Sequence, residues 1–227
     1  MSVPRCAIAE LSAATGSRDP VNIRRLRRTE LPGNTVALAR FLIGKVIVRE
    51  LPTGRLAGRI VETEAYPPRD PAAHHFRGLT PRTRSMFLRR GHAYVYFSYG
   101  NHFMLNVSSE ASGVGGGVLI RALEPLEGMQ QMQVHRQTAR VLDLLRGPGR
   151  LASALQIDRR LDGIDLCTPG PLWIGAVALA NPSSPSIPPK NRLGKSPRIG
   201  ITQAAQRLLR FYERGNPFVS GPSRLRS

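Results

Sequence analysis

The sequence has few cysteines, few lysines and few acidic residues, and it contains no long apolar run. Cys6 and Cys167 lie far apart and show no C-x-x-C or Cys/His spacing, which argues against a disulfide framework and a zinc site. No apolar stretch approaches the roughly 20 residues that span a bilayer. Glu10 interrupts the mild apolar stretch near the N-terminus, so no signal-peptide core is visible there. We therefore expect a protein of the reducing cytoplasm.

The scarcity of acidic residues leaves a large positive charge. The 227 residues include 33 lysines and arginines against 15 aspartates and glutamates, a formal net charge of +18. Only Lys45, Lys190 and Lys195 are lysines, so arginine carries nearly all of it. Codon bias exchanges lysine for arginine but does not explain the net charge. Such a charge favours a nucleic acid as partner. An anionic membrane surface is the alternative, although no basic amphipathic helix supports it.

The expected architecture is a single α+β domain. With 41% hydrophobic residues the chain can bury one sizeable core, so we expect one domain at residues 21–220 after a flexible tail at residues 1–20. Apolar, β-branched runs around turn residues predict hairpins, and capping residues predict short helices. The expected hairpins pair residues 45–51 with 55–65 and residues 93–98 with 102–108. Further strands are expected at 118–123, 172–179, 198–201 and 211–213, and helices at 36–43, 80–88, 126–136, 151–156 and 203–209. Residues 21–28 are expected to form a short helix or a DNA-contacting arm, and residues 181–195 a long loop.

One predicted strand carries two carboxylates. Polar and apolar residues alternate around Val61-Glu62-Thr63-Glu64-Ala65-Tyr66, so Glu62, Glu64 and Tyr66 share a face of the strand. Two carboxylates and a phenol are costly to bury without partners. The residues alone leave two interpretations open, a solvated acidic face of an edge strand or a reactive site.

Further motifs follow this strand in order. They are Pro71-Ala72-Ala73-His74, the segment from Thr80 to Phe87, the segment from Tyr94 to Ser109, and the segment from Val118 to Gly128. Together they resemble the alkyladenine (3-methyladenine) DNA glycosylase family, from about Arg40 to Phe218. The resemblance implies a curved antiparallel sheet with flanking helices and a protruding hairpin that contacts DNA.

The resemblance also implies an activity. A glycosylase flips a damaged nucleotide out of the duplex to reach the bond between base and sugar. The implied enzyme is monofunctional and hydrolyses the N-glycosidic bond of alkylated or deaminated purines such as 3-methyladenine, 7-methylguanine, hypoxanthine and ethenoadenine, leaving an abasic site. The alternative from another class is a non-catalytic basic nucleic-acid-binding protein of the same fold.

The family's catalytic roles fall on Glu64 and Arg121. A carboxylate can take a proton from the attacking water and stabilise a cationic sugar, and a guanidinium beside it helps keep it ionised. Glu62 lies two residues away on the same face and is the rival base, which only the resemblance sets aside.

The family's pocket and DNA contacts fall on aromatic, amide and basic residues. Aromatic faces stack on bases, and guanidiniums suit phosphates. His75 is the alternative to His74, core packing is the alternative for Tyr96, and a solvated surface is the alternative for each arginine. The implied base pocket is Tyr66, Ala72, His74, Tyr96 and Asn106; Tyr99 is the intercalating residue; Asn101, Arg82, Arg84 and Arg150 are the expected DNA contacts.

No cofactor is expected. The three lysines lie outside the motifs, so an amine nucleophile for a Schiff base is not apparent. The histidines show no metal-ligand spacing. The expected partner is double-stranded DNA with damaged purines, bound by a monomer associated with the nucleoid and not with a membrane.

Overall fold

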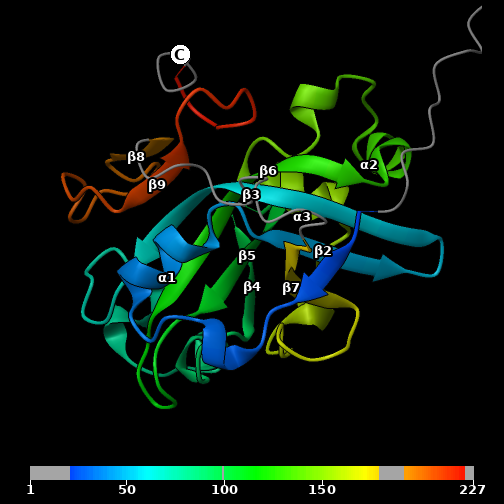
Figure 1. Ribbon diagram of the computed structural model, residues 1–227. Helices are drawn as coiled ribbons and strands as arrows, with labels where there is room; N and C mark the ends of the chain where they lie inside the picture. Colours follow the sequence, from blue (N-terminus) through cyan, green and yellow to red (C-terminus); the bar gives the residue numbers. More distant parts are fainter. Residues whose placement is uncertain (1–20, 99, 179–191, 223–227) are drawn as a thin grey trace, which may run out of the picture.

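The computed structural model describes residues 21–98, 100–178 and 192–222, and one antiparallel sheet runs through it (Figure 1). The strand order is β1-β7-β2-β3-β6-β5-β4, while β9 pairs with β3 and β8 pairs with β9. The strands are β1 (Ile23–Arg25), β2 (Val46–Leu51), β3 (Gly54–Tyr66), β4 (Ala93–Ser98), β5 (His102–Ser108), β6 (Gly117–Glu127), β7 (Leu172–Val177), β8 (Leu193–Ser196) and β9 (Arg210–Glu213). The helices are α1 (Thr35–Leu42), α2 (Met129–Arg136) and α3 (Pro148–Ala154), with 3₁₀ helices η1 (Arg28–Glu30), η2 (His74–Arg77), η3 (Arg84–Phe87), η4 (Val141–Asp143) and η5 (Arg159–Leu161).

The long strand β3 lies in the interior of this sheet. It pairs with β6 along most of its length, with β2 through its first half and with β9 at residues 62–64. Glu62 and Glu64 therefore have neighbouring strands on both sides, and neither has exposed surface. The interpretation of this segment as an edge strand with a solvated acidic face is wrong.

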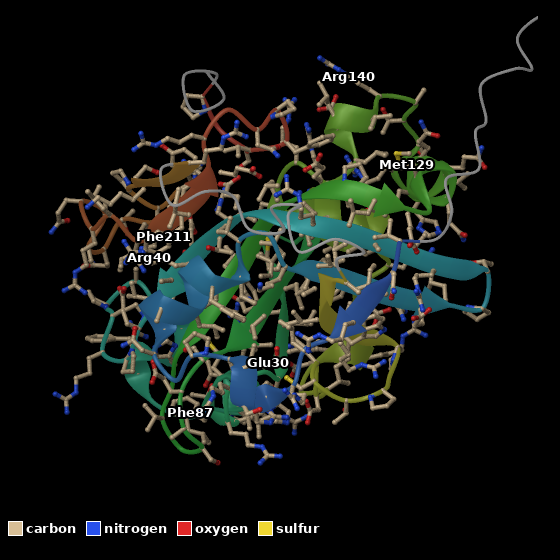
Figure 2. The ribbon with its side chains drawn as sticks, viewed as in Figure 1. Glu30, Arg40, Phe87, Met129, Arg140 and Phe211 are labelled. Carbon is tan, nitrogen blue, oxygen red and sulfur yellow. The ribbon has the colours of Figure 1, made fainter. Side chains whose placement is uncertain are left out.

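Helix α1 packs on β3 over the main hydrophobic core. Asn34 caps it, because its side chain accepts hydrogen bonds from the backbone N–H groups of Val36 and Ala37 at 3.0 and 3.1 Å. Leu38 and Leu42 point into the core. Arg40 lies over the ring of Phe211 of β9, with 5.4 Å between guanidinium carbon and ring centre (Figure 2).

Helix α3 closes the core from another direction and begins against the β4–β5 hairpin. Leu151 belongs to the same core as the α1 residues. A Cβ atom built on Gly149 would lie 2.7 Å from the Cγ of His102, so only a glycine allows α3 to approach β5 this closely.

Two irregularities in β3 and β6 decide which side chains face the core. Ile60 on β3 and Leu123 on β6 are paired and both belong to the main core. The register then slips at Val61 on β3 and again at Arg121 on β6, as in β-bulges. After these slips Ala65 and Ile120 face the core. Glu64 and Arg121 are the neighbours of Ala65 and Ile120 along their strands, so their side chains point to the face of the sheet away from the core.

The predicted α+β class is confirmed, as are both hairpins. The strands expected at 172–179 and 211–213 correspond to β7 and β9, and the helices expected at 36–43 and 151–156 correspond to α1 and α3. The predicted tail at residues 1–20 and most of the loop at 181–195 lie outside the described residues. Contact of the β4–β5 hairpin with DNA stays a prediction.

Several boundary predictions are wrong for physical reasons. Residues 21–28 contain strand β1 and not a short helix or free arm, because the edge of β7 offers pairing partners. The helix at 126–136 begins only at Met129, after Gly128 turns with φ 74°. Residues 203–209 are a series of turns, with Ala204 at φ 48°, a value that interrupts a helix. The strand expected at 198–201 lies earlier, at β8, and the helix expected at 80–88 is reduced to η3.

Candidate active site

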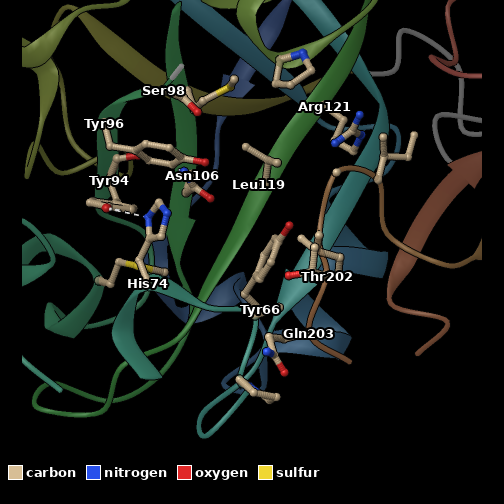
Figure 3. A pocket seen from close by; sticks show the side chains of 18 residues that line it. Tyr66, His74, Tyr94, Tyr96, Ser98, Asn106, Leu119, Arg121, Thr202 and Gln203 are labelled. Atoms are coloured by element: carbon tan, nitrogen blue, oxygen red, sulfur yellow. Dashed lines mark hydrogen bonds between the residues drawn. The ribbon is translucent and has the colours of Figure 1, made fainter. Parts of the chain in front are cut away.

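A cavity of about 520 Å³ opens beside the second half of β3. One wall carries His74, Tyr94 and Tyr96, and Tyr66 stands on the opposite wall (Figure 3). Arg121 of β6 also lines the cavity. The second wall is completed by the segment 199–203, which includes Thr202 and Gln203.

The first wall is an aromatic cluster in which a hydrogen bond joins His74 to Tyr94. The Nδ1 atom of His74 lies 3.1 Å from the hydroxyl of Tyr94. The rings of Tyr94 and Tyr96 stack with 5.3 Å between centres, and His74 meets the Tyr96 ring edge-on at 4.5 Å. Burial raises the pKa of Tyr94 to about 12, and burial together with the charge of Arg82 lowers the pKa of His74. At neutral pH the phenol is therefore protonated and the imidazole neutral, so the wall offers uncharged aromatic surface.

His75 points away from this cavity. It is 5% exposed, its Nε2 atom lies 3.1 Å from the carbonyl oxygen of Pro67, and its ring packs edge-on against Phe87. Of the two adjacent histidines, the structure thus places His74 in the cavity wall.

Glu64 lies directly behind the opposite wall. The hydroxyl of Tyr66 donates to its Oε2 atom at 2.9 Å, and the backbone N–H of Ile199 donates to its Oε1 atom at 2.8 Å. The Nη1 atom of Arg121 is 3.2 Å from the same Oε1. Burial and the charge of Glu64 raise the pKa of Tyr66, so its phenol keeps the proton that it donates. All three partners line the cavity, while Glu64 itself has no exposed surface.

Glu62 has a different set of partners. Its Oε1 atom accepts from Arg121 Nε at 2.9 Å, from Arg210 Nε at 2.6 Å and from Ser220 Oγ at 2.9 Å, and its Oε2 atom accepts from the Ser220 backbone N–H at 2.7 Å. Glu62 does not line the cavity.

Together Glu62, Glu64, Arg121 and Arg210 form a buried cluster of two carboxylates and two guanidiniums. Burial disfavours the charge of Arg121, but the neighbouring Glu64 and Glu62 outweigh that effect and raise its pKa. The formal charges balance, which satisfies the requirement that buried ions be paired.

The remaining predicted site residues fall into two groups. Ala72 and Asn106 line the cavity; the Ala72 N–H donates to Asp70 at 3.0 Å, and the Asn106 side chain donates to the Tyr94 carbonyl at 3.3 Å. The predicted DNA contacts lie outside the cavity wall. Arg82 is exposed with its guanidinium carbon 5.8 Å from the Tyr96 ring centre, Arg84 and Asn101 are exposed, and Arg150 pairs with Asp143 at 2.7 Å. Tyr99, the expected intercalating residue, lies outside the described residues.

The sequence reasoning missed three parts of the site. Tyr94 could have been found, because it shares a strand face with Tyr96. The segment 199–203 carries no pattern that predicts a cavity wall, and neither does the buried pair of Asp70 and Arg198 behind it. Within the described residues, no group of three or more His, Cys, Asp or Glu side chains is arranged to hold a metal ion, and no helix is long and apolar enough to cross a membrane.

Comparison with known proteins gives consistent matches. The family model described as methylpurine-DNA glycosylase matches residues 29–217. A Mesorhizobium japonicum protein named "Putative 3-methyladenine DNA glycosylase" is 60% identical over 200 residues, covering 88% of this chain and 92% of that protein. Proteins of the same name from Paraburkholderia phytofirmans and Methanoculleus marisnigri are 48% and 47% identical, covering 88% and 82% of this chain and 90% and 94% of theirs.

Proposed function

Because the chain belongs to the methylpurine-DNA glycosylase family, a family of hydrolases that act on N-glycosyl bonds in DNA, we propose that it flips damaged purines into the cavity beside Tyr66 and excises them. We propose alkylated and deaminated purines as its substrates, 3-methyladenine, 7-methylguanine, hypoxanthine and ethenoadenine among them. The observation that carries this proposal is the carboxylate of Glu64 beneath an aromatic cavity, bonded to Tyr66 and Arg121.

The cavity suits a flipped purine on chemical grounds. Tyr66 stands across the cavity from His74 and Tyr96, so a planar base placed between them meets aromatic surface on both sides (Figure 3). Aromatic faces favour electron-poor rings, which alkylation produces. Asn106 stands at the edge of the cavity, where its amide discriminates against the exocyclic amine of normal guanine.

We assign the general-base role to Glu64. A water attacks C1′ of the sugar, Glu64 takes the proton of that water, and the electrons of the broken C1′–N bond leave with the base. Arg121 pairs with Glu64 and supports the water. Since Glu64 has no exposed surface in the free protein, a water reaches it only when one of the groups that cover it moves aside. Among the described residues no lysine lines the cavity, which supports a monofunctional enzyme that leaves an abasic site.

The hydrogen bonds separate the two candidate bases. Glu62 accepts four hydrogen bonds, three of them at one oxygen, and does not line the cavity. Glu64 accepts a single hydrogen bond at Oε2, from a residue that lines the cavity. A carboxylate oxygen has two lone pairs, so Oε2 retains capacity for a water.

The DNA contacts follow from position and charge. Exposed Arg82 and Arg84 lie next to the cavity-lining Met86, and exposed Asn101 lies at the turn of the β4–β5 hairpin. We propose that these residues bind backbone and minor groove of duplex DNA on either side of the flipped nucleotide, with Arg150 as a further phosphate contact and Tyr99 filling the gap in the base stack. We also propose that the enzyme acts as a monomer.

The decisive test is single-turnover release of hypoxanthine and of methylated purines from duplex DNA without added metal. We expect the wild type to release them and to leave alkali-labile sites. Glu64→Gln should lower the rate constant about 10²- to 10⁴-fold, because the amide cannot accept the proton, while affinity for damaged duplex stays within about threefold, because the proposed DNA contacts are unchanged.

Glu124→Gln is the matched control. Glu124 is also a carboxylate paired with an arginine, Arg59, but it does not line the cavity, so its loss should leave the rate unchanged. Tight binding by the wild type without release of any base would contradict the proposed function and favour the non-catalytic binding protein. Equal rates for wild type and Glu64→Gln would remove Glu64 from the mechanism.

A further inference from the structure

Behind the Tyr66 wall lies a buried ion pair between Asp70 and Arg198. Arg198 Nη1 donates to Asp70 Oδ2 at 2.7 Å, and Nη2 donates to Oδ1 at 3.1 Å, a two-pronged arrangement. Both side chains have no exposed surface. The pair does not line the cavity, so it cannot contact the base itself.

This pair connects three parts of the cavity. The guanidinium carbon of Arg198 lies 4.6 Å from the centre of the Tyr66 ring, and Nη1 also donates to the Ala65 carbonyl at 3.0 Å. Asp70 Oδ1 accepts the N–H of Ala72, in the loop that leads to His74. Residue 199, next to Arg198, donates its backbone N–H to Glu64.

A role in stability alone does not account for such a pair. Buried ion pairs are often replaced by apolar residues without loss of stability, since desolvation of two charges cancels much of their attraction. They do fix geometry, because a two-pronged guanidinium–carboxylate contact permits one relative orientation. Here the group whose geometry is fixed is the ring of Tyr66, and the hydroxyl of that ring donates a hydrogen bond to Glu64.

We propose that Asp70 and Arg198 form a positioning pair that holds Tyr66 in place, so that its hydroxyl keeps the Glu64 carboxylate in one orientation. The guanidinium lies against the ring and the Ala65 carbonyl, which restricts the swing of the ring. The inference rests on the proposed function of Glu64 and adds two residues that act on it through Tyr66.

The test is a double-mutant cycle on the chemical step. Arg198→Lys keeps the charge but loses the planar contact with Tyr66 and the second prong to Asp70. At saturating enzyme we expect it to slow single-turnover excision about 10- to 100-fold, since small displacements of a reactive group cost this much. In a Tyr66→Phe background the same change should cost less than about threefold, because the hydroxyl through which it acts is gone.

Arg59→Lys provides the matched control. Arg59 also lies against carboxylates, with 2.7 Å from its Nη1 to Glu213, but it has no contact with the cavity, and its replacement should leave the excision rate unchanged. Equal losses for Arg198→Lys in the wild-type and Tyr66→Phe backgrounds would overturn the proposal, as would no loss in either.

Hydrogen exchange separates this inference from the proposed function. The Ile199 amide should exchange faster in Arg198→Lys and in Asp70→Asn than in wild type or Arg59→Lys, because its bond to Glu64 depends on the position of Arg198. This holds even if the wild type excises no base, in which case the proposed function fails and the positioning pair does not. Unchanged exchange at Ile199 in both variants would overturn the positioning role regardless of activity.

Discussion

Two glutamates separated by one residue have distinct environments. Arg121, which lines the cavity, contacts both glutamates; the other partners of Glu62 are Arg210 and Ser220, which do not line it, whereas the other partners of Glu64, Tyr66 and Ile199, do. The same residue type therefore serves two purposes on one strand face. Glu62 joins three segments of the chain, and Glu64 is available to the cavity.

The residue scale gives a prediction for Glu62. Glu62→Ala leaves Arg121 and Arg210 buried with one carboxylate fewer, and removing one partner of a buried pair costs about 3–5 kcal/mol. We expect the free energy of unfolding, measured by urea denaturation, to fall by about that amount.

Arg160→Ala is the comparison for that experiment. It breaks the exposed pair with Asp158, in which the Arg160 side chain is 86% exposed, and it should change the free energy of unfolding far less, because solvent screens such a pair. If Glu62→Ala cost no more than Arg160→Ala, the described role of Glu62 would be wrong.

At the scale of elements, the paired irregularities of β3 and β6 create the site. Without them the alternation of a regular strand would continue through Ile60, and Glu62 and Glu64 would face the core that holds Leu123. Each strand instead contributes an extra residue. Glu62 and Arg121 lie where the register shifts and bind each other there.

Helix α1 gives the prediction at this scale. Asn34→Ala removes the side chain that accepts two backbone N–H groups at the start of α1, and we expect a loss of about 1 kcal/mol in the free energy of unfolding. Asn34→Ser retains an oxygen at the cap and should stay within about 0.5 kcal/mol of wild type. Equal losses for both variants would show that the cap is not the cause.

How far the sequence predicts the structure depends on whether the signal is local. The β2–β3 and β4–β5 hairpins were predicted because turn residues separate two apolar runs. The sharing of one face by Glu62, Glu64 and Tyr66 also followed from strand periodicity.

Features that depend on distant contacts were not predictable. Arg198 was predicted to lie in a strand. In the structure it forms a buried ion pair with Asp70, which is 128 residues away in the sequence, and no local pattern reveals such a contact. The burial of Glu62 and Glu64 depends on the pairing of β9 with β3, and no local sequence pattern predicts that pairing. The roles of Glu64, Arg121 and the cavity residues came from family resemblance and stay proposals.

At the scale of the whole molecule, the main feature is the formal net charge of +18. Many arginines are engaged in ion pairs, including Arg121, Arg198 and Arg210 in the interior. Arginines and carboxylates that are paired in the interior cancel each other's charge. The excess positive charge is therefore carried by arginines at the surface.

We predict that affinity for duplex DNA falls linearly on a log–log plot against salt concentration, with a slope of about −0.9 per phosphate contacted. Arg84→Ala should reduce the magnitude of that slope by about one and weaken binding to damaged and undamaged duplexes alike, because a phosphate contact carries no base information. Fluorescence anisotropy between about 50 and 200 mM salt measures both.

Arg55→Ala is the control for the salt experiment. Arg55 is an exposed arginine near the start of β3, at the other end of that strand from Tyr66, and it pairs with Glu50. Its removal should leave the slope unchanged. A slope altered equally by both variants would mean that charge acts globally and not through a contact at Arg84.

The bonds of Glu62 also bear on how the protein is made. Its partners Arg210 and Ser220 follow it by 148 and 158 residues, so they leave the ribosome long after β3 does. Until then the carboxylates of β3 lack half of the guanidiniums that balance them. The nascent chain can form its early hairpins during translation, but it completes the charge cluster on this face of the sheet only when Arg210 and Ser220 emerge.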